Sequence, residues 1–85
     1  IINTGSSVDH DSVLSEGVHI CPGARIAGNV QIGSKSTIGI GSSINKGIKI
    51  GSNVIVGAGA AVVRNIDNNL IVKGVPAKAK INLEE

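Results

Sequence analysis

The sequence of 85 residues contains no phenylalanine, tyrosine, tryptophan or methionine. A compact domain of this length normally fills part of its core with aromatic side chains, which bury large areas. Isoleucine, valine, leucine and alanine must therefore form the interior, and we expect a thin and repetitive core. The missing aromatic residues also argue against nucleic acid as a partner, because single-stranded nucleic acid is bound by stacking bases on aromatic rings.

Cysteine is nearly absent as well, and long apolar runs are missing. The single cysteine, Cys21, cannot form an internal disulfide or a cysteine zinc cluster. No base is identified beside it, so an inert packing role is the simplest interpretation. No segment resembles a signal peptide, and no apolar run approaches the length of a membrane span. We therefore expect a cytoplasmic protein with no membrane partner.

The charge is only mildly basic, with a formal net charge of +2. Three of the six acidic residues, Asp9, Asp11 and Glu16, lie near the start of the chain, whereas all lysines and arginines lie later. A basic bias of this kind would suit a phosphorylated ligand. Ordinary solubilising charge also explains this bias, and composition alone favours that explanation.

A branched aliphatic residue recurs at every sixth position without an insertion. The residue four positions later is small or β-branched, and glycine or asparagine often follows the aliphatic residue, where we expect it to serve a turn conformation. A period of six fits neither an α-helix nor an alternating strand, but it is typical of a solenoid of short strands and tight turns. The repeated aliphatic residues are Ile2, Val8, Leu14, Ile20, Ile26, Ile32, Ile38, Ile44, Ile50, Val56 and Val62.

Three hexads form one three-sided coil, so residues eighteen apart are expected to stack. The predicted fold is all-β, a parallel β-helix of hexapeptide repeats over residues 1–66, in which Ile66 occupies a small-residue turn position. The period then fails, and residues 67–85 are predicted to form a C-terminal cap or arm. Ile1 opens in mid-pattern without a polar cap, so we expect that preceding coils are missing from this chain. The thin prism favours an oligomer.

His10 lies between two aspartates in the motif VDHD, at an outward corner of the predicted coil. Asp9 or Asp11 could orient the imidazole and raise its basicity, as in general bases. Aspartates are also common turn formers, and an exposed polar corner residue is an equally simple interpretation. Stacking places Gly28 next to His10, where the missing side chain would leave room for a ligand.

A second edge of the prism carries Pro22, Ile40 and Ala58. Ile40 is the one large aliphatic residue at an outward corner, and this strip could hold an apolar ligand arm or a neighbouring subunit. His19 lies beside the strip, whereas His10 lies on a different edge. We therefore expect the two histidines to share a substrate only between neighbouring chains of a trimer.

The stretch INTGSSVDHDSVLSEGVHICPGARIAGNV, followed by IGIGSSINKGIKIGSNVIVGAGAAVVRNI and GVPAK, closely resembles the hexapeptide-repeat acetyltransferases of bacterial surface-glycan synthesis. The nearest groups are the sialic acid O-acetyltransferases and the UDP-4-amino-sugar N-acetyltransferases. The resemblance implies a left-handed β-helix, a homotrimer, and acetyl-CoA bound in a groove between neighbouring prisms. It also implies a sugar nucleotide or sialic acid as acceptor. Members of this family normally carry an N-terminal sugar-nucleotide-binding domain, which we expect to be absent from this chain.

The resemblance assigns roles to single residues. It makes His10 the general base and gives Asp11 the role of enhancing its basicity. His19 is expected to touch acetyl-CoA near the thioester. The remaining candidates from the resemblance are Ile40 and Ala58 along the CoA arm, and Asn3 and Gly28 at the acyl end or the acceptor. Separately from the resemblance, we expect the basic residues near the C-terminus to meet the CoA phosphates; these are Arg64, Lys73 and Lys78.

The predicted reaction is therefore acetyl transfer from acetyl-CoA to an amine or a hydroxyl. A non-catalytic β-helical trimerisation scaffold is the alternative, and saturable binding of acetyl-CoA separates the two. A metal enzyme like the hexapeptide-type carbonic anhydrases needs three histidine ligands, and this chain has two. We therefore expect no metal site.

Overall fold

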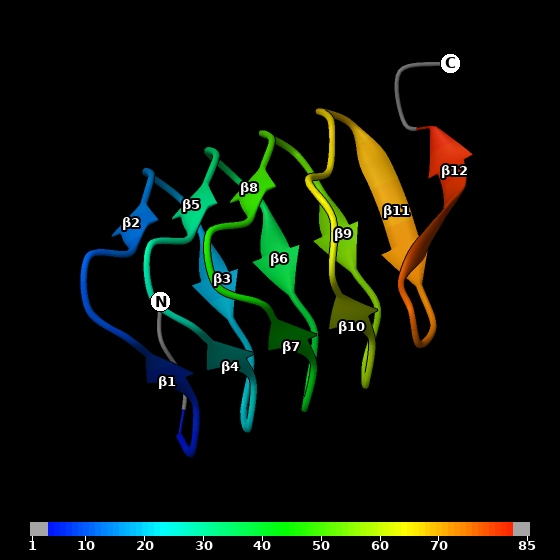
Figure 1. The fold of residues 1–85 in the computed structure, drawn as a ribbon. Helices are drawn as coiled ribbons and strands as arrows, with labels where there is room; N and C mark the ends of the chain where they lie inside the picture. The colour runs from blue at the N-terminus through cyan, green and yellow to red at the C-terminus, as the bar shows by residue number, and fades with distance from the viewer. Residues whose placement is uncertain (1–3, 83–85) are drawn as a thin grey trace.

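The computed structural model describes residues 4–82 and consists of strands joined by turns. Short strands of two residues follow one another at regular intervals, and two longer strands end the described chain (Figure 1). The strands are β1 (Ser7–Val8), β2 (Val13–Leu14), β3 (His19–Ile20), β4 (Arg25–Ile26), β5 (Gln31–Ile32), β6 (Thr37–Ile38), β7 (Ser43–Ile44), β8 (Lys49–Ile50), β9 (Ile55–Val56), β10 (Ala61–Val62), β11 (Leu70–Lys73) and β12 (Lys78–Asn82).

The strands stack into three sheets that form the sides of a column (Figure 1). The β1 sheet contains β1, β4, β7 and β10, and the β2 sheet contains β2, β5 and β8. The β3 sheet contains β3, β6, β9 and β11, with β12 added at its edge. Stacked strands run parallel, and Ser7 pairs with Arg25, eighteen positions later. The predicted all-β parallel β-helix is therefore confirmed.

The core consists of the aliphatic residues that the hexads predicted. Ile20, Ile26, Ile32 and Ile38 point inward and are at most 2% exposed. Burying one such side chain stabilises the fold by about 1.5–3 kcal/mol. The residue before each of them in its strand is exposed or only partly buried. Each two-residue strand therefore supplies one core residue and one surface residue.

Serine fills some of the small interior positions, and its hydroxyl is fully satisfied there. Ser36 is completely buried. Its Oγ donates to the carbonyl of Gly51 at 2.7 Å and accepts from the N–H of Val54 at 3.0 Å. The hydroxyl thus ties two stacked coils together, which offsets the cost of burying a polar group.

Each described corner before β10 contains one residue with left-handed backbone geometry. Glycine and asparagine dominate these positions because most L-residues are strained at positive φ. The series recurs every six residues and comprises Gly5, Asp11, Gly17, Gly23, Asn29, Lys35, Gly41, Gly47, Asn53 and Gly59.

The glycines that directly follow a core residue do not have the turn role that we predicted for them. Gly33 and Gly39 are absent from the positive-φ positions of the described chain. A Cβ at Gly33 would lie 2.6 Å from the carbonyl carbon of Gly51, and a Cβ at Gly39 would lie 2.5 Å from the carbonyl oxygen of Val56. These glycines are therefore required by close approach of the next coil, and the predicted turn role was wrong.

The last coil is two residues shorter than the others, which corrects the predicted position of Ile66. Ile66 pairs with Ile50, sixteen positions earlier, instead of occupying a small turn position. Ile71 likewise pairs with Ile55. The six-residue spacing therefore ends after Val62, although the chain still completes another coil of the β-helix.

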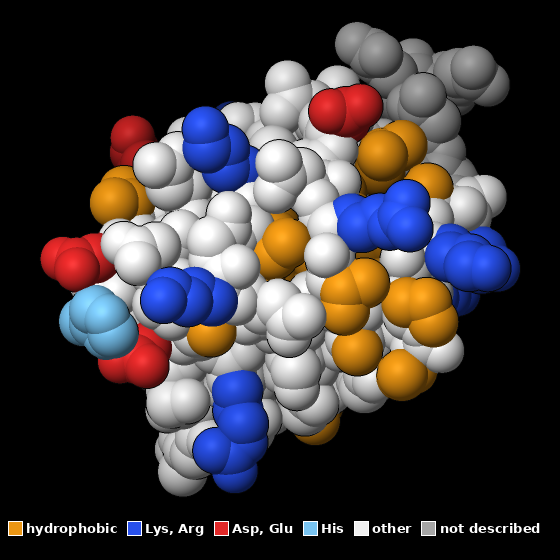
Figure 2. Space-filling model, in the orientation of Figure 1, with side chains coloured by type: hydrophobic (Ala, Val, Ile, Leu, Met, Phe, Trp, Pro, Cys, Tyr) orange, Lys and Arg blue, Asp and Glu red, His pale blue; other side chains and the backbone are white. Residues whose placement is uncertain are grey.

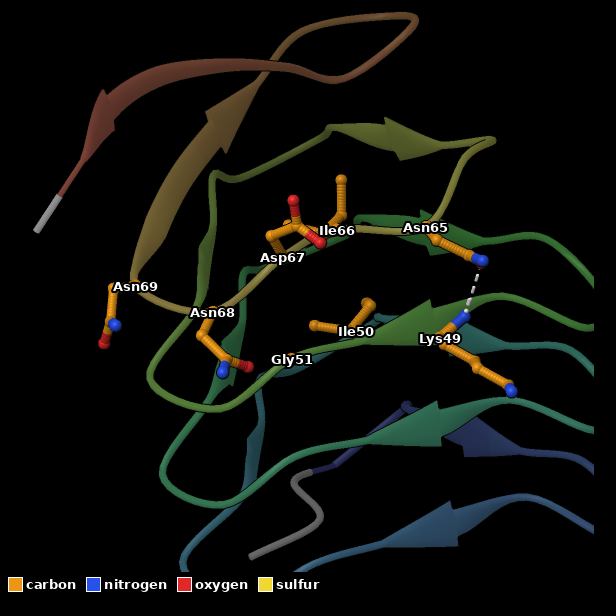
Figure 3. Close-up of a pocket in the computed structure, with 8 residues that line it drawn as sticks. All are labelled: Lys49, Ile50, Gly51, Asn65, Ile66, Asp67, Asn68 and Asn69. Atoms are coloured by element: carbon orange, nitrogen blue, oxygen red, sulfur yellow. Dashed lines mark hydrogen bonds between the residues drawn. The ribbon is translucent and has the colours of Figure 1, made fainter. Parts of the chain in front are cut away.

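Asparagine side chains complete the shortened coil (Figure 3). Asn65 Oδ1 accepts from the backbone N–H of Lys49 at 2.9 Å, and Asn68 Oδ1 accepts from the N–H of Ser52 at 2.8 Å. Asn53 Nδ2 donates to Asn69 Oδ1 at 3.0 Å. A hollow of about 530 Å³ remains beside these residues. The amides replace strand hydrogen bonds, so we interpret this hollow as a consequence of the shortened coil.

Residues 67–82 contain the two longer strands. β11 lies parallel to β9, and β12 folds back antiparallel to β11 (Figure 1). The loop between them is fixed to β10, because Ala61 N–H donates to the carbonyl of Gly74 and Ala77 N–H donates to the carbonyl of Ala61. Between residues 4 and 82 there is no helix with the length and apolar character needed to cross a membrane.

Candidate active site

His10 lies at the corner between β1 and β2, where the β1 and β2 sheets meet. Its side chain is 69% exposed, and that of Asp9 is 62% exposed. The imidazole Nδ1 lies 2.9 Å from Asp9 Oδ1, and the same oxygen accepts the backbone N–H of His10 at 2.7 Å. An ionised carboxylate can only accept hydrogen bonds, so Nδ1 carries the proton. In the neutral ring, Nε2 is then the basic nitrogen.

The same contacts act on Asp9. The hydrogen bond from the imidazole lowers the pKa of the Asp9 carboxyl, and the backbone hydrogen bond and the charge of His10 lower it further. Asp9 is therefore an ionised acceptor at neutral pH. The sequence left open whether Asp9 or Asp11 orients the imidazole, and the carboxylate that bonds to the ring is that of Asp9.

Asp11 occupies the left-handed corner position, with a φ of 59°. Asn29 has the same φ at the equivalent corner of the next coil. This geometry agrees with the turn-forming role of aspartate. The expected effect of Asp11 on the basicity of His10 stays a prediction.

Gly28 is buried directly beside the His10 ring. A Cβ at Gly28 would lie 3.1 Å from His10 Cε1 and 3.3 Å from Nε2. The N–H of Asn29 donates to the carbonyl of His10 at 3.1 Å, which confirms that the two corners stack. The imidazole thus takes the space that we expected a ligand to enter. The role of Gly28 in binding the cofactor stays a prediction.

Ser12 attaches the His10 corner to the next coil. Its Oγ donates to the carbonyl of Ala27 at 2.8 Å and accepts from the N–H of Val30 at 3.2 Å. Ala27 and Val30 are on either side of the Gly28–Asn29 corner. Sequence reasoning did not assign this role to Ser12, although its place in the small-residue series of the hexads was visible.

A hollow of about 440 Å³ adjoins this corner on the face of the β1 sheet. Arg25 and Asp9 line it, and so place opposite charges at the same surface. The other lining residues come from the same stacked strands and are Ser7, Val8, Ile26, Ala27, Ser43 and Ile44.

The second predicted edge also forms. Gly41 N–H donates to the carbonyl of Pro22, and Gly59 N–H donates to the carbonyl of Ile40, so the strip of Pro22, Ile40 and Ala58 is stacked as expected. Ile40 is 60% exposed. This edge lies between the β3 and β1 sheets, away from the corner of His10.

His19 is exposed on the β3 sheet, where it pairs with Thr37. His10 lies where the other two sheets meet, so one chain does not bring the two histidines together. Asn3 lies outside the described residues. Within residues 4–82, no group of three or more histidine, cysteine, aspartate or glutamate side chains is arranged to hold a metal ion.

Hydrophobic side chains gather toward the C-terminal end of the column, close to lysine and arginine side chains (Figure 2). A groove of about 290 Å³ is found in this region, between the end of β10 and the loop that leads into β12. Its lining combines apolar and basic residues, namely Val63, Arg64, Pro76, Ala77 and Lys78. Two of the predicted phosphate-binding residues, Arg64 and Lys78, are therefore neighbours.

Comparisons with known proteins give the same architecture. The family model for the bacterial transferase hexapeptide (six repeats) matches residues 29–64. A single-residue mutant of perosamine N-acetyltransferase from Caulobacter crescentus, solved with CoA and GDP-perosamine, is 41% identical with a TM-score of 0.91. The match covers 92% of this chain and 37% of that protein. The acetyltransferase domain of PglB from Neisseria gonorrhoeae, solved with acetyl coenzyme A, is 44% identical with a TM-score of 0.92, and the match covers 93% and 38%.

A third similar structure is serine acetyltransferase from Neisseria gonorrhoeae, which is 33% identical with a TM-score of 0.86. The match covers 93% of this chain and 34% of that protein. The chain thus spans less than two-fifths of the length of these three proteins. From the stacked hexads and these matches we conclude that the chain belongs to the hexapeptide-repeat family of bacterial transferases.

Proposed function

We propose that the chain forms the catalytic β-helix of an acetyl-CoA-dependent acetyltransferase. The acceptor is an amine or a hydroxyl of a bacterial sugar nucleotide or of sialic acid. The observation that carries this proposal is the exposed imidazole of His10, held by Asp9 on a β-helix similar to acetyltransferases that bind CoA or acetyl-CoA.

In the proposed reaction, the acceptor nitrogen or oxygen attacks the carbonyl carbon of the thioester. His10 Nε2 removes the proton of the acceptor as the new bond to carbon forms. The carbon–sulfur bond then breaks, and the departing thiolate takes the proton from the imidazolium. Asp9 accepts the Nδ1–H bond throughout, which fixes the ring and stabilises its charged form.

Charge on the thioester oxygen grows during the attack and needs a hydrogen-bond donor. We assign this role to a backbone N–H or to His19. Because His19 and His10 lie on different sides of one column, His19 has to come from a neighbouring chain. A homotrimer with acetyl-CoA in the groove between adjacent columns would meet this requirement.

The stacked strip of Ile40 and Ala58 supplies an apolar surface for the arm of acetyl-CoA. The groove with Arg64 and Lys78 supplies positive charge for its phosphates. Lys73 is the third basic candidate. These assignments place the co-substrate along the outer edges of the column, where no core residue has to move.

The proposal is tested by incubating the full-length protein with acetyl-CoA and a panel of amino-sugar nucleotides and sialic acid. We expect release of free thiol, measured colorimetrically, with one class of acceptor. Calorimetric titration with acetyl-CoA alone is the companion measurement. If acetyl-CoA does not bind saturably, the chain is a trimerisation scaffold and the proposed activity is wrong.

A further inference from the structure

We propose that Gly28 is a positioning residue for His10, because its missing side chain allows the imidazole to lie directly against the neighbouring coil. The inference rests on the proposed function of His10 as general base. It differs from the predicted contact of Gly28 with the cofactor, because Gly28 here acts through the imidazole.

The ring is restrained at two places. Asp9 Oδ1 accepts Nδ1–H at 2.9 Å on one edge of the ring. The adjacent edge, formed by Cε1 and Nε2, faces Gly28, where an added methyl carbon would lie only 3.1 Å from Cε1 and 3.3 Å from Nε2. Nε2, which is expected to take the proton from the acceptor, is therefore one of the two atoms closest to a Cβ placed on Gly28.

Both restraints depend on the coil that contains Gly28, because the segment with Asp9 and His10 is hydrogen-bonded to it. The backbone N–H of Asp9 donates to the carbonyl of Ile26 at 2.9 Å, and the N–H of Asn29 donates to the carbonyl of His10 at 3.1 Å. The chain segment that carries Asp9 and His10 is thus fixed to residues on both sides of Gly28. Asp9 and Gly28 consequently both fix the position of the ring relative to the coil that carries Gly28.

The second restraint matters because the ring is mostly exposed. An imidazole that is 69% exposed has few packing contacts to select one orientation. A single hydrogen bond still permits the ring to rotate about the line between donor and acceptor. The neighbouring coil limits this rotation, because it lies so near the ring at Gly28 that an added Cβ would be 3.1 Å from Cε1. Orientation of a catalytic group can change a rate by orders of magnitude.

The backbone at Gly28 does not itself require glycine. Its φ lies outside the left-handed region, in contrast to Gly23 and Gly41. The nearest atoms to an added Cβ belong to the imidazole, whereas at Gly33 and Gly39 they belong mainly to the backbone. We therefore expect Gly28→Ala to move the exposed ring by a few tenths of an ångström and to leave the coil intact.

The test is a double-mutant cycle in the full-length protein with Gly28→Ala and His10→Ala. We expect Gly28→Ala to lower kcat about tenfold, with the KM for acetyl-CoA unchanged. In the His10→Ala background the same substitution should have no further effect, because the ring on which it acts is gone. Equal losses in both backgrounds would overturn the inference, as would a raised KM for acetyl-CoA with an intact kcat.

A second measurement does not depend on catalysis. The hydrogen bond from the ring lowers the pKa of Asp9, so a displaced ring should allow that pKa to rise toward the ordinary value of an aspartate. Carboxyl ¹³C NMR titration of Asp9 in the wild type and in Gly28→Ala measures this change. An unchanged Asp9 titration would contradict the inference. If His10→Ala instead retains wild-type turnover while Asp9 responds to Gly28→Ala, the proposed function fails and the positioning contact stands.

Gly57→Ala is the matched control for folding. Its φ is also outside the left-handed region, and its added Cβ would meet the flexible side chain of Lys73 at 3.1 Å. We expect both alanine variants to unfold within a few degrees of the wild type by circular dichroism. Failure of Gly28→Ala to fold would contradict the argument that the added methyl group contacts mainly the exposed ring.

Discussion

The imidazole of His10 has two carboxylate neighbours in sequence but one hydrogen-bonded carboxylate in space. Asp9 belongs to the extended segment that follows β1, and its side chain reaches both N–H groups of His10. Asp11 has already entered the left-handed corner. The two aspartates flank the same residue, so only the change of backbone conformation between them decides which one orients the ring.

This difference predicts unequal effects of two conservative substitutions. Asp9→Asn removes the charge that stabilises the imidazolium, so we expect kcat to fall by roughly 10- to 100-fold, a part of what a positioned base contributes. Asp11→Asn keeps a residue that tolerates positive φ, as Asn29 does at the next corner, and we expect a smaller loss. Steady-state kinetics of the two variants provides the comparison. A larger loss for Asp11→Asn would show that the role implied by the family resemblance is correct and that of Asp9 is secondary.

At the scale of strands and coils, the six-residue period was sufficient to predict which residues stack. Ile26 and Ile44, or Pro22 and Ile40, are neighbours because every coil from the first to the third has the same length. The period could not predict the shortened fourth coil. There, the side-chain oxygens of Asn65 and Asn68 replace backbone acceptors, and such a replacement leaves no apolar pattern in the sequence.

The interior serines provide a prediction for the stability of the coils. Ser36→Ala would leave the N–H of Val54 and the carbonyl of Gly51 without their partner in the core. We expect the free energy of unfolding to fall by about 1–3 kcal/mol. The midpoint of urea denaturation measures this loss, with Ser15→Ala as the control because Ser15 is exposed. Equal midpoints for the two variants would show that the hydroxyl of Ser36 contributes little.

At the scale of the whole molecule, a single column is thin and leaves aliphatic side chains on its surface. It measures 33 × 24 × 21 Å, and Val13 and Ile55 are 57% and 41% exposed at outward strand positions. The two histidines lie on separate sides of this column. Sequence stacking predicted that separation, but a single chain cannot reveal which neighbouring surface faces each histidine.

Mixed oligomers test whether the site is shared between chains. Subunits that carry His10→Ala are mixed with subunits that carry His19→Ala, after reversible dissociation. In a shared site, some interfaces then contain both native histidines, so we expect acetyl transfer well above that of either variant alone. Sedimentation equilibrium verifies that the mixture has the mass of a trimer. If activity does not recover in correctly assembled mixtures, the two histidines do not act in one site.

The central claim is that His10 removes the proton of the acceptor, and turnover of His10→Ala tests it most directly. The measurement is kcat for acetyl transfer by the full-length protein, with the affinity for acetyl-CoA determined in parallel. We predict a fall in kcat of about 10²–10⁴-fold with nearly unchanged affinity. Turnover at the wild-type rate in His10→Ala would contradict the account.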